Sequence, residues 1–440
     1  MTRLPGSLFA TLKSITLITV AIAAQASLAQ APSGTPTVLT GARLFDGTGN
    51  APIERSVLVI RDGRIEAVGS ASTMTVPADA EHIDLTGKTI LPGLINAHGH
   101  LNTVMPGAAP GRENLRAQLR LYASYGVTTV VVLGIGDGDM DAALALRDEQ
   151  QAGGALDGAR LLVAGPSLQN LATAAEARAR VNAYADAGVD LVKIHVTGGP
   201  NDMPPEVYGA LIEQAHIRGL DVAAHVYYLA DARGLVNAGV DVLAHSVRDQ
   251  DLDAALIAEI KRRNVGYIPT LTRDLARFVY ETTPGFVSDP FFLRSSAAYR
   301  GELDRVTDPA YQAEMRNSAV RQADKIGLRQ GSRNLKIASD AGIAIGLGTD
   351  SGTNVGQWQG YFEHTELEMM VEAGLSPAQV LVAATGDAAR MMELDQELGT
   401  LQPGRWADLV VLDANPLDDI RATRQIDAVW VAGVQLADVR

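Results

Sequence analysis

The stretch Thr89-Ile-Leu-Pro-Gly-Leu-Ile-Asn-Ala-His-Gly-His-Leu101 is an apolar run that ends in two histidines, His98 and His100, separated by one glycine. In a β-strand, residues i and i+2 point to the same side, so a strand here would direct both imidazoles toward one point. Neutral imidazole is the commonest protein ligand for a divalent transition metal. A His-x-His pair also arises often by chance, so its meaning depends on what later parts of the chain supply.

After His98, apolar runs rich in β-branched residues alternate with alanine-rich, charge-dotted segments that suit helices. With the run before His98, eight strand-like segments are found, the others at residues 126–133, 160–165, 189–196, 221–226, 241–246, 265–271 and 344–350. Eight alternating β and α segments predict an α/β protein whose residues 91–392 form a parallel (β/α)8 TIM barrel. The chemistry of such a barrel lies at the C-terminal ends of its strands.

Residues that can bind metal ions gather at these predicted strand ends. In chain order they are His98, His100, Lys193, His195, His225, His245 and Asp350. Histidines scattered over a core or a surface would seldom fall this way. We expect the remaining three histidines, His82, His216 and His364, to have structural or surface roles.

Both ends of the chain predict short strands instead of alternating units. Residues 37–90 contain the hairpin signal Arg61-Asp-Gly-Arg64, and residues 393–440 return to β-type runs. We expect the two segments to pair as one small β-sandwich domain beside the barrel.

One interval of the barrel region is longer than the fold requires. The chain from His245 to Asp350 is about 40 residues longer than two βα units need. The excess maps to residues 273–311, which hold four of the seven phenylalanines of the chain. An aromatic insertion after a barrel strand predicts a lid or substrate wall that faces a bulky apolar group. The alternative is a packing or oligomer contact, and a homo-oligomer is compatible with the sequence.

The overall composition excludes several classes of partner and site. A net charge of −14 argues against nucleic acids and anionic membranes, which would repel the protein at long range. The absence of cysteine excludes disulfides, thiolate ligands and a cysteine nucleophile. Arg3 and Lys13 precede a short apolar segment followed by small residues, so residues 1–29 predict a signal peptide and an exported, periplasmic protein.

Taken together, these residues resemble the amidohydrolase superfamily of metal-dependent (β/α)8 barrels. The resemblance runs from about residue 37 to the C-terminus. Within the superfamily, Lys193 followed by Thr197-Gly-Gly199 is similar to the imidazolonepropionase-like and prolidase-like dipeptidase and ochratoxin-amidase branch, whose strand-four lysine is carboxylated. The segments that match are Pro92-Gly-Leu-Ile-Asn-Ala-His-Gly-His100, Val192-Lys-Ile-His-Val-Thr-Gly-Gly199, Gly348-Thr-Asp350 and the closing segment over residues 376–410.

The resemblance implies two divalent metal ions, for which nitrogen and oxygen ligands favour Zn²⁺ and also admit Mn²⁺, Co²⁺ and Fe²⁺. A hydroxide bridging the ions would attack the scissile bond, and Asp350 would shuttle its proton. The implied ligands are His98, His100 and Asp350 for one ion, His225 and His245 for the other, and a CO₂-derived carbamate on Lys193 as the bridge.

The implied activity is hydrolysis of an amide bond in a dipeptide-like or N-acyl amino acid substrate. A lactone, carbamate or other cyclic C–N or C–O bond is the alternative within the superfamily. Deamination is disfavoured, because such members place His-x-x-Glu after strand five, where this chain has His225-Val-Tyr-Tyr228. A non-catalytic binding protein on this fold would be expected to have lost ligands, and none is missing.

Four further roles stay open from the sequence. Lys193 could instead be an ordinary lysine that positions groups beside a single metal ion. His195 lies two residues after Lys193, so the two side chains point to the same side of the predicted strand. His195 suits a position behind the metal ligands or in the core. Tyr228 could donate to the oxyanion, and Arg273 could bind a substrate carboxylate through two hydrogen bonds.

Overall fold

The protein was analysed as a computed structural model that describes residues 34–105, 107–154, 156–199, 201–294 and 300–437. The signal peptide predicted for residues 1–29 lies outside the described residues. Of the helices that are described, none is both long and apolar enough to span a bilayer.

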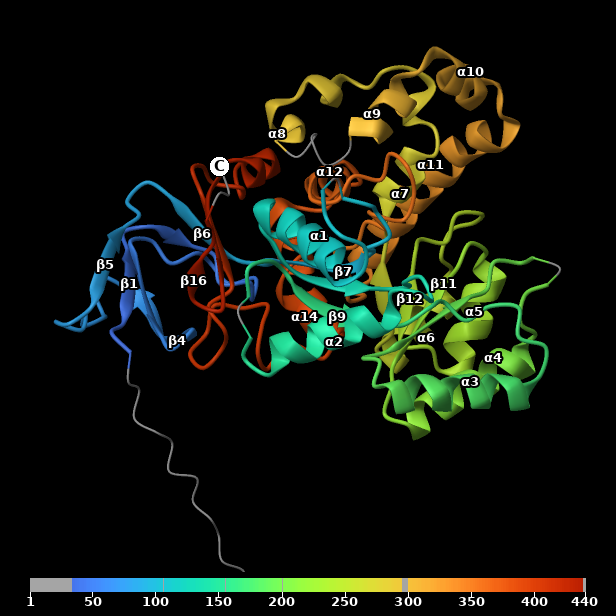
Figure 1. Ribbon diagram of the computed structural model, residues 1–440, viewed down its shortest axis with the longest axis horizontal. Helices are drawn as coiled ribbons and strands as arrows, with labels where there is room; N and C mark the ends of the chain where they lie inside the picture. The colour runs from blue at the N-terminus through green and yellow to red at the C-terminus, as the bar shows by residue number, and fades with distance from the viewer. Residues whose placement is uncertain (1–33, 106, 155, 200, 295–299, 438–440) are drawn as a thin grey trace, which may run out of the picture. The chain divides into compact units, whose positions relative to one another are not determined.

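Seven parallel strands form two sheets in which the strands follow chain order (Figure 1). Nearly all of their residues are buried, because helices and loops cover these strands. The first sheet contains β7 (Leu94–Gly99), β8 (Val127–Val132) and β9 (Arg160–Val163). The second contains β10 (Val192–His195), β11 (Val222–His225), β12 (Val242–Ala244) and β13 (Gly266–Ile268). The predicted α/β class is confirmed.

Backbone contacts continue beyond the edges of both sheets. Leu168 and Ile194 form a parallel bridge next to β10, and Tyr267 of β13 forms another with Ile345. On the far side of residues 345–350, the Ala97 N–H of β7 donates to the Leu347 carbonyl at 2.8 Å. The segment that leads to Asp350 therefore lies between β13 and β7.

Helices follow the strands along the chain, and residues at their ends determine where they begin and end. Thr173 and Asp253 cap the first turns of α3 and α6 through their side chains. Gly188 and Gly239 end α3 and α5 in the left-handed conformation, which glycine adopts without steric cost. These helices are α1 (Arg112–Ser124), α2 (Met140–Gln151), α3 (Ala174–Ala187), α4 (Pro205–Ile217), α5 (Leu229–Ala238), α6 (Ala254–Arg263) and α11 (Ala319–Asp340).

After the eighth strand-like segment come α12 (Tyr361–Glu372), α13 (Pro377–Ala383) and α14 (Gly386–Met391). Ser376 and Gln379 form a capping box at the start of α13, in which each side chain bonds the backbone of the other.

The insertion after β13 is helical. It consists of α7 (Leu271–Ala276), two short 3-10 turns, α8 (Pro290–Leu293), α9 (Arg300–Thr307) and α10 (Pro309–Asn317). Figure 1 shows α8, α9 and α10 gathered on the side of the protein where α7 and α12 lie. Phe286 and Phe292 pack against Tyr361 of α12 with ring centroids 5.4 and 5.2 Å apart.

The remaining strands form two further sheets from the two ends of the chain. One sheet has the order β4-β3-β1-β5, the other β16-β15-β14-β6-β2. In the second sheet, β14 pairs antiparallel with β6, so a strand from the C-terminal part of the chain lies beside a strand from the N-terminal part. The bounds are β1 (Thr37–Thr40), β2 (Arg43–Leu44), β3 (Ser56–Arg61), β4 (Arg64–Ser70), β5 (Glu81–Asp84), β6 (Thr89–Pro92), β14 (Leu409–Leu412), β15 (Ile426–Val431) and β16 (Val434–Gln435).

Candidate metal centre

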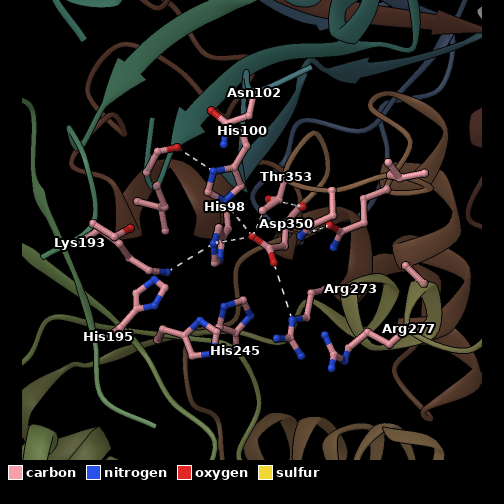
Figure 2. Close-up of a pocket in the computed structure, with 18 of the residues that line it drawn as sticks. His98, His100, Asn102, Lys193, His195, His245, Arg273, Arg277, Asp350 and Thr353 are labelled. Atoms are coloured by element: carbon pink, nitrogen blue, oxygen red, sulfur yellow. Dashed lines mark hydrogen bonds and ion pairs between the residues drawn. The ribbon is translucent and has the colours of Figure 1, made fainter. Parts of the chain in front are cut away.

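A cavity of about 690 Å³ lies at the C-terminal ends of the parallel strands. Figure 2 shows side chains from several strands pointing into it from opposite sides. Six of the seven strand-end residues named from the sequence are imidazole or carboxylate groups, and the seventh is a lysine. All seven line this cavity: His98, His100, Lys193, His195, His225, His245 and Asp350.

His98 lies at the centre of this group. Its Nε2 atom is 3.4 Å from the Lys193 Nζ atom and 3.3 Å from the Asp350 Oδ1 atom. Its Nδ1 atom is buried and has no hydrogen-bond partner among the described residues. The backbone N–H of His98 donates to the Asn96 Oδ1 atom at 3.0 Å, which fixes the end of β7.

The two oxygen contacts of His100 call for either a second ring proton or a metal ion beside Asp350. Its Nδ1 atom is 2.7 Å from the Gly134 carbonyl, which only accepts, so Nδ1 carries the ring proton. In the neutral ring Nε2 then holds a lone pair, and it lies 2.8 Å from the Asp350 Oδ1 atom. Two acceptors at this distance repel each other unless a second proton or a metal ion lies with them.

The other imidazoles extend the group across β10, β11 and β12. The ring centroids of His98 and His245 are 4.6 Å apart, those of His225 and His245 are 4.1 Å apart, and those of His195 and His225 are 4.6 Å apart. The Nδ1 atom of His245 is 2.6 Å from the Thr270 Oγ1 atom, which orients the ring.

The protonation states suit metal ligation. Burial lowers the pKa of His98 to about 3 and that of His195 to about 4, and it holds the pKa values of His225 and His245 well below the ordinary range. Burial alone would raise the pKa of Asp350, but its polar contacts with His100 and His98 hold it well below its usual range. Neutral imidazoles and an ionised carboxylate are the forms that bind cations.

Lys193 is 1% exposed, and burial lowers the pKa of its ammonium to about 7. One ligand atom from each of His98, His245 and Asp350 lies within 4.8 Å of the other two, a spacing that a single ion could span. The donor set therefore fits divalent cations that prefer nitrogen and oxygen ligands.

A buried polar network lies behind the ligands. The Glu363 carboxylate of α12 accepts hydrogen bonds from the Asn96 amide at 2.6 Å and from the Thr349 and Ser351 hydroxyls at 2.7 Å each. Asn96 in turn holds the backbone of His98, and the two hydroxyls flank Asp350. Glu363 therefore positions both sides of the candidate metal centre.

Replacing Glu363 by alanine is expected to lower the free energy of unfolding by about 3 kcal/mol or more, because three buried donors would lose their acceptor. Metal affinity is expected to fall about tenfold to a hundredfold, as when outer partners of metal ligands are removed. Chemical denaturation and metal titration measure the two effects. Glu372→Ala, an exposed site on the same helix, is the matched control and should change neither. Equal metal affinity in Glu363→Ala and the parent protein would contradict the positioning role.

Tyr228 lies apart from the other predicted site residues. Its side chain is 41% exposed and does not line the cavity. A Cβ atom at Gly198 would lie 2.7 Å from the Tyr228 ring, so the ring covers the loop after β10. Tyr227 lies beside it and stacks with Arg248 at 4.8 Å.

The histidines expected to be structural have other partners. The Nε2 atom of His216 is 2.9 Å from the Asp241 carboxylate at an exposed position. His364 is buried, and its Nε2 atom donates to the Tyr125 carbonyl at 2.8 Å. Neither of these two side chains lines the cavity.

The insertion does line the cavity, but not through its phenylalanines. None of Phe278, Phe286, Phe291 and Phe292 is among the lining residues that the structure describes. The lining side chains from residues 273–311 are Arg273, Ala276, Arg277, Arg305 and Tyr311. The insertion therefore contributes to the cavity wall through these residues and not through the phenylalanines. Phe286, Phe291 and Phe292 pack on Tyr361 of α12.

Several contributors were missed from the sequence. Thr270 and the Gly134 carbonyl contact the ligand residues His245 and His100, and Glu363 bonds the residues that flank the ligands. Of the residues in this network, Thr349 alone could have been noticed in the sequence, because it lies within the segment Gly348-Thr-Asp350.

Comparison with known proteins points in the same direction. The sequence profile of the amidohydrolase family matches residues 89–436. A candidate prolidase from Bifidobacterium longum, known from its crystal structure, is 32% identical, with a TM-score of 0.73 and coverage of 92% of this chain and 95% of its own.

Two curated proteins are similar over shorter or weaker matches. A 5-methylthioadenosine/S-adenosylhomocysteine deaminase from Symbiobacterium thermophilum is 26% identical over 417 residues, covering 86% of this chain and 85% of its own. Ochratoxinase from Aspergillus niger is 25% identical over 276 residues, covering 59% of this chain and 48% of its own.

Proposed function

This chain belongs to the amidohydrolase family, whose members hydrolyse carbon–nitrogen bonds, and we propose that it cleaves an amide bond in a dipeptide-like or N-acyl amino acid substrate. The observation that carries the proposal is the convergence of five histidines, Lys193 and Asp350 on one buried cavity. The similarity to a candidate prolidase and to ochratoxinase supports an amide as the bond that is cleaved.

The residues present would hold two divalent ions, for which Zn²⁺ suits the nitrogen and oxygen donors best. Ions bound here would supply an activated water near neutral pH and polarise the scissile carbonyl. The proposed ligands are His98, His100 and Asp350 for one ion, His225 and His245 for the other, and carboxylated Lys193 between them.

The surroundings of Lys193 support its carboxylation. CO₂ adds to an uncharged amine with release of one proton, and a pKa near 7 leaves much of this amine uncharged at neutral pH. The product is an anion with two oxygens, whereas an ammonium group has no lone pair for a cation. The amine lies 3.4 Å from the His98 Nε2 atom, itself a proposed ligand.

Asp350 is placed to move the proton. Its Oδ1 atom faces His98 and His100, whereas its Oδ2 atom is 3.8 Å from the Arg273 Nε atom on the cavity side. Oδ2 can take the proton of the attacking water and then deliver it to the leaving amine. The Arg273 guanidinium lies beside this oxygen and is itself paired with Asp274.

A second candidate function is deamination, which the similarity to the Symbiobacterium deaminase favours. The sequence after β11 argues against it, since Tyr228 stands where the deaminase pattern has glutamate. Cleavage of a lactone or carbamate would use the same groups and is a closer alternative.

A hydrolysis panel tests the proposed function. The full chain, loaded with Zn²⁺, is offered dipeptides, N-acyl amino acids, ochratoxin-like amides, lactones and adenosine derivatives. We expect amide hydrolysis that disappears on chelation and returns with metal. Turnover of lactones or adenosine derivatives without any amide turnover would overturn the reaction class.

The oxyanion role of Tyr228 stays a proposal, supported by its position three residues after the candidate ligand His225 at the end of β11. Its ring would have to leave the loop at Gly198 on substrate binding. Tyr228→Phe is then expected to lower kcat about a hundredfold with unchanged metal content. Tyr227→Phe is the matched control, since its ring faces Arg248. Unchanged kcat in Tyr228→Phe would remove this residue from the mechanism.

We also propose the finer architecture and the location. The bridges at Leu168 and Tyr267 and the bond from Ala97 to Leu347 support one closed (β/α)8 barrel. The core that Leu58 of the first chain-end sheet shares with Leu409 of the second supports a small β-sandwich domain. Export to the periplasm follows from the leader sequence at residues 1–29.

A further inference from the structure

The cavity above the candidate metal centre is strongly basic. Four arginines line it, whereas Asp350 is the single carboxylate among the lining residues that the structure describes. The whole chain carries a net charge of −14, so this local excess of positive charge runs against the overall charge. The arginines are Arg273, Arg277, Arg305 and Arg321.

Two of these arginines have protein carboxylates of their own. Arg273 pairs with Asp274 at 2.7 Å and approaches Asp350 at 3.8 Å. Arg277, four residues later, pairs with Asp324 of α11 at 2.6 Å. Figure 2 shows both arginines on one side of the cavity near Asp350, so they form the part of the arginine group closest to the reacting bond.

Arg305 and Arg321 differ in this respect. Neither has a carboxylate oxygen within 4.0 Å of its guanidinium among the residues described. Arg305 of α9 lies 5.5 Å from the centre of the Tyr311 ring. Glu302, on the same helix, accepts from the Gly356 N–H at 3.2 Å. Burial raises the pKa of Glu302 and the charge of Arg305 lowers it in part, but the two side chains form no ion pair within 4.0 Å. Asp324, the acidic residue three places after Arg321, is the partner of Arg277.

We propose that Arg305 and Arg321 form a subsite for a second acidic group of the substrate, which is therefore the amide of an acidic amino acid such as glutamate or aspartate. This inference rests on the proposed amide hydrolysis and names its substrate class. One carboxylate of such a substrate would meet Arg273 near the reacting bond, and the side-chain carboxylate would meet Arg305 and Arg321.

The chemistry of the side chains favours this reading over an apolar or cationic substrate. A guanidinium binds carboxylate through two parallel hydrogen bonds, and such charge-assisted bonds are stronger than neutral ones. Two guanidiniums that have no carboxylate within 4.0 Å in the described part of the chain would instead repel the side chain of a lysine or arginine substrate. The phenylalanines of the insertion are turned away, so no large apolar wall competes for the same space.

The test compares paired substrates that differ by one charge. We measure kcat/KM of the Zn²⁺-loaded full chain for Ala-Glu against Ala-Gln, and for N-acetylglutamate against N-acetylglutamine. The acidic member of each pair is expected to be favoured about tenfold to a hundredfold. In Arg305→Gln/Arg321→Gln, the ratio should fall to within about threefold of one. Arg329→Gln, on an exposed position of α11, is the matched control and should keep the parent ratio.

A binding measurement separates this inference from the proposed function. Calorimetric titration with glutarate and with its monoamide needs no turnover, and glutarate should bind at least about tenfold more tightly only when both arginines are present. Selective glutarate binding without any amide turnover would contradict the proposed function and still support the subsite. Amide turnover with equal or better use of the neutral substrates would overturn the subsite. If the double variant does not fold, Arg305→Lys and Arg321→Lys are measured singly. A lysine cannot form the two parallel hydrogen bonds of a guanidinium, so single variants that fully keep the parent preference for the acidic substrate would also overturn the subsite.

Discussion

Replacing Lys193 by alanine is expected to remove bound metal and amide hydrolysis together. Two ions bound at this site would supply several kcal/mol of transition-state stabilisation. At 1.36 kcal/mol for each factor of ten, a loss of about 4 kcal/mol lowers kcat/KM about a thousandfold. Metal content by mass spectrometry and initial rates on the best amide of the panel measure the two effects.

The matched control for Lys193→Ala is Lys336→Ala, which removes an exposed lysine paired with Asp340 on α11. A second arm adds acetate or propionate to Lys193→Ala, because a small carboxylate can enter the vacated space and replace the carbamate oxygens. Return of metal and activity together supports the bridge. Full metal content and activity in Lys193→Ala would contradict the proposal, and full metal content with lost activity would indicate an ordinary lysine beside the metals.

The strand-end residues could be predicted from the sequence because two regularities act together. Side chains alternate along a strand, and all strands of a parallel sheet present their C-terminal ends at the same edge. His98 lies within β7, Lys193 within β10, and His225 ends β11. Their shared cavity follows from this geometry without knowledge of any long-range contact.

What supports and surrounds those residues could not be predicted in the same way. Glu363 lies on α12 and reaches Asn96 across 267 positions of the chain, and no local pattern marks such a pair. Thr270 was read only as part of a strand, although its hydroxyl orients His245. Pairings of this kind are decided by how the helices pack, which the periodicity of a single segment does not encode.

The insertion shows the limit of composition as a guide. Its phenylalanine content correctly marks residues that need an apolar environment, but it does not say which side provides one. Phe286 and Phe292 find that environment on Tyr361 of α12. The cavity side is left to Arg273, Arg277 and Arg305, so the sign of the substrate's charge became visible only in the structure.

Asp350→Asn is expected to lower kcat about a hundredfold to ten-thousandfold, the range for loss of a general acid–base group. The amide keeps the volume of the side chain and an oxygen toward His98 and His100, but it cannot accept a proton from water and return it to the leaving amine. KM is expected to change much less than kcat. The matched control is Asp340→Asn, which makes the same change at an exposed carboxylate of α11.

Paired leaving groups separate proton transfer from ligation. An alkyl amide needs its leaving nitrogen protonated, whereas a p-nitroanilide of the same acyl group departs with much less help. If Asp350 supplies that proton through Oδ2, Asp350→Asn should slow the alkyl amide far more than the anilide at equal metal content. An equal loss on both substrates, together with loss of one metal ion, would assign Asp350 to ligation alone. The 3.8 Å approach of Arg273 to Oδ2 then predicts that Arg273→Gln changes the pH dependence of kcat only while Asp350 is present.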